Sequence, residues 1–269
     1  MGTSYSDRAP QHYHLDIRKQ AEVDECLDSF KPTVVFLCVI SPGGVEACEK
    51  FPHWTFFLEV QGTANVAVAT VRHRAKLIYF STDYVFDGRC GPYSEQAMPN
   101  PINAYGRHKW QAEDIALGCS EKSLVIRTTA VFGWSRTSSN IVMQVYEALS
   151  IGQRFSAPSN QWCNPTFVDF LAEASVEVAL KGESGILNIV GNDRSDRASF
   201  AEMLALAMGF DYKLIGSVET DRLGQSAKRP LQGGLTTEKL EGLGIKPPDL
   251  EESLRLFRES YEAALCQKP

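Results

Sequence analysis

Short apolar runs alternate with amphipathic stretches along the first half of the chain. The run Thr33–Ile40 is apolar at consecutive positions, which is typical of a strand in a parallel sheet covered by helices on both faces. Similar segments predict further strands at Tyr13–Asp16, Lys76–Ser81, Ser123–Thr128 and Ile186–Val190. Amphipathic spacing predicts helices at Lys19–Phe30, Trp54–His73, Ala104–Leu117, Ile141–Ser150, Val168–Leu180, Ser199–Met208 and Leu254–Leu265. This alternation predicts an α/β fold with a doubly wound parallel sheet.

The alternation loosens beyond about Gly133, where shorter segments follow one another with turns between them. No internal repeat and no low-complexity linker separates this half from the first. We therefore expect two interleaved units. Residues 1–135 would form the sheet domain, and residues 136–269 would form a smaller lobe that also supplies the last elements of the sheet.

Composition and charge exclude several classes of protein. The 269 residues are 43% hydrophobic and 22% charged, as in folded globular domains. The net charge of −6 argues against a nucleic-acid partner, and no apolar run approaches the roughly 20 residues that span a bilayer. The seven cysteines have neither CxxC nor Cys/His ligand spacing, so we expect reduced thiols, no metal site and a cytoplasmic location.

The pair Tyr105 and Lys109 is the strongest local signal for chemistry. Residues four apart on a helix share a face, and a nearby ammonium should lower the pKa of the tyrosine toward neutrality. Such a phenol can exchange a proton with a carbonyl oxygen. Thr82 and Asp83 follow an apolar strand, where ligands of open α/β sheets bind. The alternative is a surface Tyr–Lys pair and an ordinary turn.

Several motifs resemble those of the extended short-chain dehydrogenases/reductases. They include Ser81–Gly88 (STDYVFDG), the Asn103–Lys109 segment of the pattern PxNxYGxxK, Ile126–Thr128 and Arg229-Pro230. The chain is most similar to the dTDP-4-dehydrorhamnose reductase branch, which also contains the regulatory β subunit of methionine adenosyltransferase. The resemblance covers nearly the whole chain and implies a Rossmann-like fold with a small C-terminal substrate lobe.

The resemblance implies a catalytic trio of Thr82, Tyr105 and Lys109. It implies hydride transfer from NADPH, or NADH, to the C4 carbonyl of a nucleotide-linked sugar, with Tyr105 as proton donor. The cofactor-binding positions that it implies are Asp16 and Ile17 beside the adenine, Cys38, Val39 and Ile40 at a strand end, and Tyr105 and Lys109. The substrate-binding positions are Thr82, Asp83, Trp162 and Arg229. Arg229 would bind the diphosphate, or it would simply pair with a carboxylate of the chain.

The chain departs from the family pattern at its beginning. Neither GxGxxG nor GxxGxxG occurs, and Gly2–Ser6 resembles the second strand of the family. The NAD(P)-binding domain is therefore expected to be N-terminally incomplete, lacking its first βα unit of about 30 residues. Its absence would leave two strands without the neighbour they share. A fragment of a normal reductase is favoured over a genuinely shortened form with impaired cofactor binding.

Two further positions differ from the family and keep two functions open. Glu59 replaces an asparagine that often supports the lysine, and Ala130 replaces an aromatic residue that packs on the sugar. The leading hypothesis is an enzyme that reduces a nucleotide-linked 4-keto sugar. The alternative is a non-catalytic regulatory subunit resembling the methionine adenosyltransferase β subunit. The partners would be the nucleotide sugar, and a second copy of the chain or a partner enzyme.

Overall fold

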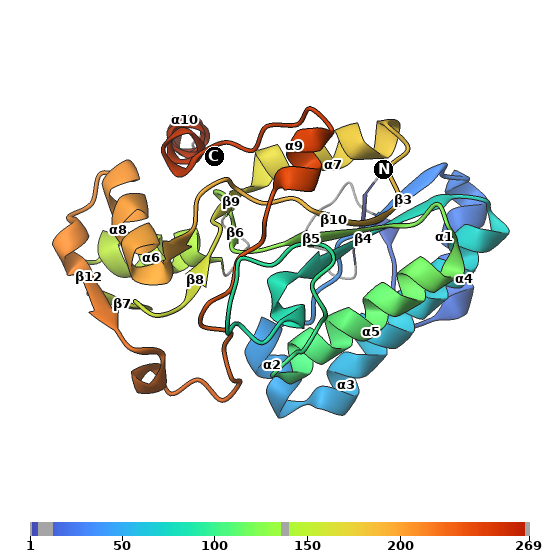
Figure 1. Ribbon diagram of the computed structural model, residues 1–269, viewed down its shortest axis with the longest axis horizontal. Helices are drawn as coiled ribbons and strands as arrows, with labels where there is room; N and C mark the ends of the chain where they lie inside the picture. Colours follow the sequence, from blue (N-terminus) through green and yellow to red (C-terminus); the bar gives the residue numbers. More distant parts are fainter. Residues whose placement is uncertain (1, 5–12, 136–139, 267–269) are drawn as a thin grey trace.

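The centre of the protein is a four-stranded parallel sheet. The computed structural model describes residues 2–4, 13–135 and 140–266. The strand order is β10 (Gly185–Asn188), β5 (Leu124–Thr128), β4 (Lys76–Thr82) and β3 (Val34–Leu37), as Figure 1 shows. Every neighbouring pair is parallel. The predicted α/β class with a parallel sheet is confirmed.

Helices cover both faces of this sheet (Figure 1). On one face, α1 (Gln20–Phe30), α4 (Gly62–Arg72) and α5 (Ala104–Cys119) pack with β3 and β4 in one apolar core. On the other face, α7 (Val168–Leu180) and α9 (Glu238–Gly242) pack against β4, β5 and β10. Burial on both faces explains why the strands are apolar at consecutive positions.

The first two strands stand apart from the main sheet. β1 (Thr3–Ser4) pairs in parallel with β2 (Tyr13–His14), and this pair has no ladder to β3 within the described residues. The sequence predicts this separation into two groups of parallel strands that share no neighbouring strand. β3 itself ends at Leu37, earlier than predicted, because the Val39 carbonyl accepts a hydrogen bond from the Lys109 side chain instead of a neighbouring strand.

The predicted helix at Trp54–His73 contains an interruption. Its segments are α3 (Pro52–Phe56), the π-helical turn η1 (Phe57–Gln61) and α4. A short helix that was not predicted, α2 (Gly44–Lys50), precedes them. A π turn holds one residue more than an α turn, so it changes which side chains face the sheet. Here the turn carries Glu59.

The smaller lobe has its own core between α6 (Ile141–Ser150), α8 (Arg197–Ala207) and α10 (Leu250–Cys266). Phe132 is buried there against Phe200 and Phe257. The other elements of this region are β6 (Val131–Phe132), β7 (Phe155–Pro158), β8 (Trp162–Cys163), β9 (Thr166–Phe167), β11 (Ser195–Asp196), β12 (Ile215–Val218), η3 (Tyr212–Leu214) and η4 (Thr220–Leu223). The domain boundary at residue 135 stays a prediction.

The second half of the chain also returns to the main sheet. After α7, β10 pairs with β5 and completes the sheet at that edge. The lobe built around α6, α8 and α10 is therefore continuous in sequence with sheet elements. No helix in the described ranges is both long enough and apolar enough to cross a membrane.

Candidate active site

The carboxyl end of β4 and the first turn of α5 place the predicted trio. Thr82 ends β4 and the short turn η2 (Asp83–Val85) follows. α5 begins after Asn103, whose side chain accepts a hydrogen bond from the Gly106 amide at 2.8 Å. A Cβ at Gly106 would lie 2.1 Å from the Tyr84 carbonyl oxygen. Only glycine lets the helix approach the turn this closely, which brings Tyr105 to the end of β4.

The structure brings Thr82, Tyr105 and Lys109 together. Thr82 is close enough to Tyr105 to lower the pKa of that phenol, and its hydroxyl accepts a hydrogen bond from the Tyr84 amide at 3.2 Å. The Lys109 ammonium donates to the carbonyls of Val39 and Phe80 at 3.1 and 3.0 Å. The helical pair is therefore a buried one, and the surface alternative is excluded by the position of Lys109, which is 3% exposed.

Glu59 lies beside the buried lysine. Its Oε1 accepts a hydrogen bond from the Ser41 amide, and its Oε2 lies 3.5 Å from Lys109 Nζ. Glu59 is 1% exposed, so water does not screen this pair strongly. The glutamate at the family's asparagine position is thus a partner of the lysine and not a solvated side chain.

The pKa of Tyr105 differs from the sequence-based expectation. Lys109 lowers it, as expected, and so does the hydrogen bond from Thr82. Burial nevertheless raises the pKa of Tyr105 well above its usual range, and the negative charge of Glu59 adds to this effect. The expectation that the pKa of Tyr105 is lowered overall is therefore wrong for the unliganded protein. Burial and the charge of Glu59 outweigh the effect of the Lys109 ammonium.

The expected cofactor positions fall into two groups. Cys38 and Ile40 are exposed just beyond β3, next to the Val39 carbonyl that binds Lys109. Asp16 and Ile17, beyond β2, are both buried. The Asp16 carboxylate binds the Arg18 guanidinium at 2.8 and 2.7 Å, and this hydrogen bonding lowers its pKa. The Ile17 side chain packs so closely on Gly62 that a Cβ there would clash.

A cavity of about 620 Å³ opens between the sheet domain and the smaller lobe. Its walls come from both halves of the chain, and Tyr84, whose ring contacts the Tyr105 ring at 5.8 Å, is part of them. The lining residues that carry charge or contact the trio are Glu46, Tyr84, Arg197 and Arg229. The position of Ala130, where the family has an aromatic residue, is also in this wall.

The expected substrate residues are distributed unevenly around this cavity. Arg229 lines it, but its guanidinium is bound to Glu46 at 2.6 Å and to Gln225 at 3.1 Å. Asp83 is buried and accepts a hydrogen bond from the Gly234 amide, so it joins the strand end to the chain segment before α9. Trp162 is outside the lining, and its ring faces Arg194. The substrate roles of these residues stay predictions.

Arg197, at the start of α8, is a lining residue that the sequence analysis did not identify. The Tyr84 side chain and the charge of Asp83 stabilise its guanidinium, and its pKa is raised above the usual value although burial opposes this. No sequence motif contains Arg197. Only the packing of α8 against β7 and β11 in the smaller lobe brings it to the cavity.

The comparison with protein families decides the classification. Residues 3–263 match the model of the RmlD substrate binding domain. The chain belongs to the RmlD family. This membership confirms the resemblance to the dTDP-4-dehydrorhamnose reductase branch.

The relatives of this chain include both named reductases and a methionine adenosyltransferase subunit. The chain is 28% identical over 261 residues to a dTDP-4-dehydrorhamnose reductase of Aggregatibacter actinomycetemcomitans, covering 92% of this chain and 88% of the relative. It is also 28% identical over 253 residues to methionine adenosyltransferase 2 subunit beta of Xenopus tropicalis, covering 91% and 75%. The dTDP-4-dehydrorhamnose reductase of Bacillus anthracis, solved in complex with NADP, superposes with a TM-score of 0.85 at 25% identity, covering 93% and 91%.

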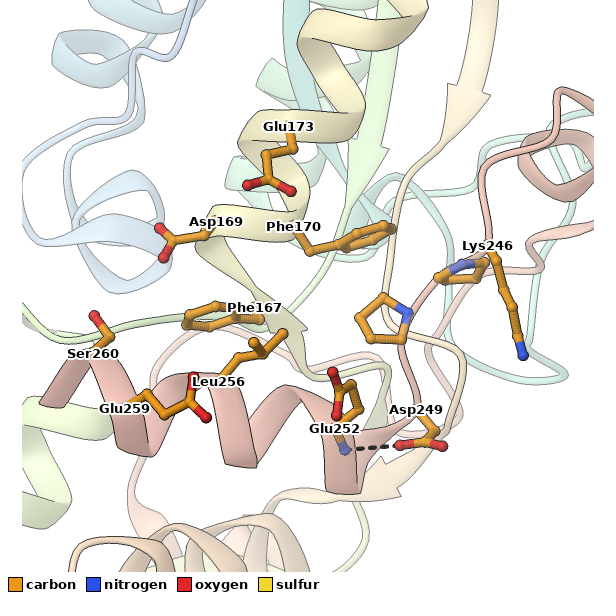
Figure 2. A pocket seen from close by; sticks show the side chains of 12 residues that line it. Phe167, Asp169, Phe170, Glu173, Lys246, Asp249, Glu252, Leu256, Glu259 and Ser260 are labelled. Carbon is orange, nitrogen blue, oxygen red and sulfur yellow. Dashed lines mark hydrogen bonds between the residues drawn. The ribbon is translucent and has the colours of Figure 1, made fainter. Parts of the chain in front are cut away.

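A second cavity of about 610 Å³ lies away from the trio. Figure 2 shows α7 and α10 facing each other across it, with Phe167, Phe170 and Leu256 forming apolar walls. Its charged lining residues are Asp169, Glu173, Lys246, Asp249, Glu252 and Glu259. Among the described residues, no three His, Cys, Asp or Glu side chains are grouped in a way that could hold a metal ion.

Proposed function

We propose that this protein is an oxidoreductase that uses NADPH to reduce the C4 carbonyl of a nucleotide-linked sugar. The observation that carries the proposal is the assembly of Thr82, Tyr105 and Lys109 beside a cavity between the two lobes. Membership of the RmlD family and the similarity to named dTDP-4-dehydrorhamnose reductases support the substrate class.

Tyr105 is the proton donor in this proposal. Its raised pKa keeps the phenol protonated at neutral pH, which is the form that can donate to a carbonyl oxygen during reduction. The Thr82 hydroxyl, beside Tyr105, orients the same carbonyl oxygen. Lys109 holds its positive charge close to the developing oxyanion and is fixed by two carbonyls and Glu59.

The residues near Lys109 fit the nicotinamide end of the cofactor. Ile40 is 55% exposed and Cys38 is exposed, so the strand end beside the trio has surface free for a ring to pack against. When bound, NADPH supplies the hydride. Val39, Tyr105 and Lys109 complete this contact, and Asp16 and Ile17 would lie beside the adenine. The NADP in the Bacillus anthracis structure supports a nicotinamide cofactor, and NADPH is the form that we propose.

An assay of NADPH oxidation with dTDP-4-keto-6-deoxy sugar tests this proposal. We expect absorbance at 340 nm to fall only when both compounds are present, with a reduced sugar as the product. A parallel measurement of NADPH binding separates the steps. If NADPH binds and the sugar is not reduced, this function is contradicted.

The second candidate is a regulatory subunit, and the similarity to methionine adenosyltransferase 2 subunit beta favours it. The buried Glu59–Lys109 pair is compatible with it, because Glu59 opposes the effect of the lysine on Tyr105. Co-purification with a methionine adenosyltransferase catalytic subunit, without reductase turnover, would support this candidate. A homodimer is the other assembly that we consider. A cytoplasmic location is part of the proposal and agrees with the free thiols of the seven cysteines.

A further inference from the structure

Two arginines line the cavity between the lobes, and their electrostatic environments differ. Arg229 forms an ion pair with Glu46 at 2.6 Å and a hydrogen bond with Gln225 at 3.1 Å. Its charge is therefore neutralised within the protein. Arg197 forms no ion pair within 4.0 Å with any carboxylate of the described residues, and Tyr84, which lines the same cavity, favours its charged form.

Two carboxylates could compensate the charge of Arg197, namely Asp196 and Asp83. Both accept hydrogen bonds from backbone amides instead. Asp196, the preceding residue, caps α8 by accepting hydrogen bonds from the Ala198 and Ser199 amides, both at 3.0 Å. Asp83 accepts a hydrogen bond from the Gly234 amide, and burial raises its pKa, which disfavours the anionic form. Neither acid can fully compensate the guanidinium.

A partly buried cation that faces a large cavity is costly unless an anion reaches it. The planar guanidinium offers parallel N–H donors that match phosphate oxygens. The other walls of the cavity carry one acid, Glu46, and that acid already binds Arg229. An anion entering the cavity therefore meets Arg197 as the cation that the protein has left unpaired.

We propose that Arg197, and not Arg229, binds the diphosphate of the nucleotide-linked substrate in this cavity. The Tyr84 ring contacts the Tyr105 ring and lines the same cavity as Arg197, so it links the trio to the wall where the phosphates would bind. A sugar attached to the diphosphate would then extend from Arg197 toward Tyr105. The inference rests on the proposed function for the identity of the ligand, but the anion site can be measured without turnover.

Calorimetry with thymidine 5′-diphosphate tests the site, with thymidine as the uncharged counterpart. We expect Arg197→Gln to weaken binding of the diphosphate by about ten- to a hundredfold, the effect of losing a charged hydrogen bond, and to leave any thymidine binding unchanged. Arg197→Lys keeps the charge but loses the bidentate geometry, so it should lose affinity by a smaller factor. NADPH binding serves as the check that each variant is folded.

Two further variants provide matched comparisons. Arg154→Gln removes the same charge from an exposed position of the same lobe and should bind the diphosphate as the unmodified protein does. The double variant Glu46→Gln/Arg229→Gln removes an ion pair whose two charges cancel. Its loss of affinity for the diphosphate should be smaller than that of Arg197→Gln. A loss for the double variant as large as that of Arg197→Gln, or wild-type affinity of Arg197→Gln, would overturn the proposal.

The outcomes also separate this inference from the proposed function. Diphosphate binding that depends on Arg197, without reduction of the sugar, would support the site and contradict the reductase. If the sugar is reduced but the affinity for the diphosphate does not depend on Arg197, the reductase is supported and the Arg197 site is contradicted. Failure of the unmodified protein to bind the diphosphate would overturn the site.

Discussion

The two cavities have nearly the same volume, about 620 and 610 Å³, but opposite electrostatic character. The cavity between the lobes is lined by two arginines and one glutamate, and it adjoins the trio. The cavity between α7 and α10 has five carboxylates and one lysine on its walls. Size therefore does not distinguish them.

The charged side chains that line the two cavities differ in the ion pairs that they form within the protein. Beside the second cavity, Arg255 forms ion pairs with Glu252 and Glu259, and Asp249 accepts a hydrogen bond from the Glu252 amide. Glu252 and Glu259 thus have a partner in their own helix, whereas Asp169, Glu173 and Lys246 form no ion pair among the described residues. In the first cavity, Arg197 has no carboxylate partner within the described residues, so a ligand has a charge to neutralise. The comparison indicates that the sign of the lining charge, and not the volume, distinguishes the two cavities.

The largest expected difference between the two regions is catalytic. Tyr105→Phe removes the proposed proton donor and should lower kcat by about 10²- to 10⁴-fold, with NADPH binding retained. Ser260→Ala removes a hydroxyl from the second cavity and should leave kcat unchanged. Steady-state kinetics on both variants would check this. Equal losses would show that the chemistry does not depend on the trio.

A second difference concerns ion pairs. Arg127 lies in β5, is 1% exposed and binds the Glu113 carboxylate of α5 at 2.9 and 2.7 Å. Arg127→Met should lower the free energy of unfolding by about 3–5 kcal/mol, because it leaves a buried carboxylate without a partner. Arg255→Met breaks an exposed pair, which should affect stability far less.

Urea denaturation measures these changes. The double variant Arg127→Met/Glu113→Leu removes both charges and should recover most of the lost stability. If the single and double variants are equally unstable, the loss is one of packing and not of an unpaired charge. The exposed pair at Arg255 provides the baseline for a charge removed in water.

The smallest expected effect is a shift in pH dependence. Glu59 raises the pKa of both Tyr105 and Lys109, so Glu59→Gln should lower both. Reduction requires protonated Tyr105, and activity falls as pH rises through its pKa. The alkaline limit of activity should therefore move to lower pH.

A pH profile of kcat detects this shift. Glu59→Asp keeps the charge and should move the limit less, and Glu252→Gln, which changes an exposed carboxylate of the second cavity, should not move it. An unchanged alkaline limit in Glu59→Gln would mean that Glu59 only fills space beside the lysine.

Local patterns predict the elements and the trio well. Consecutive apolar positions identify β4 and β5 because both faces of each strand are buried. The spacing of Tyr105 and Lys109 is sufficient to predict that the two side chains lie close together, because one helix carries both. The first two strands form a pair separate from the main sheet among the described residues, as the sequence predicts.

Properties that depend on packing between distant segments are not predictable in this way. The sequence does not show that burial of Tyr105 outweighs the ammonium of Lys109, or that Glu46, 183 residues away, neutralises Arg229. Arg197 lies in no motif, and it lines the same cavity as Tyr84 only after the two lobes have folded against each other. The site is therefore predictable where one element carries it, and not where two lobes meet.

The π-helical turn at Phe57–Gln61 makes the active site sensitive to insertions and deletions. One residue corresponds to about 100° of rotation in an α-helix. Deleting a residue from this turn would restore a regular helix and rotate Glu59 relative to α4, away from Lys109. A change in chain length alone, with every catalytic side chain retained, would be enough to uncouple the carboxylate from the lysine.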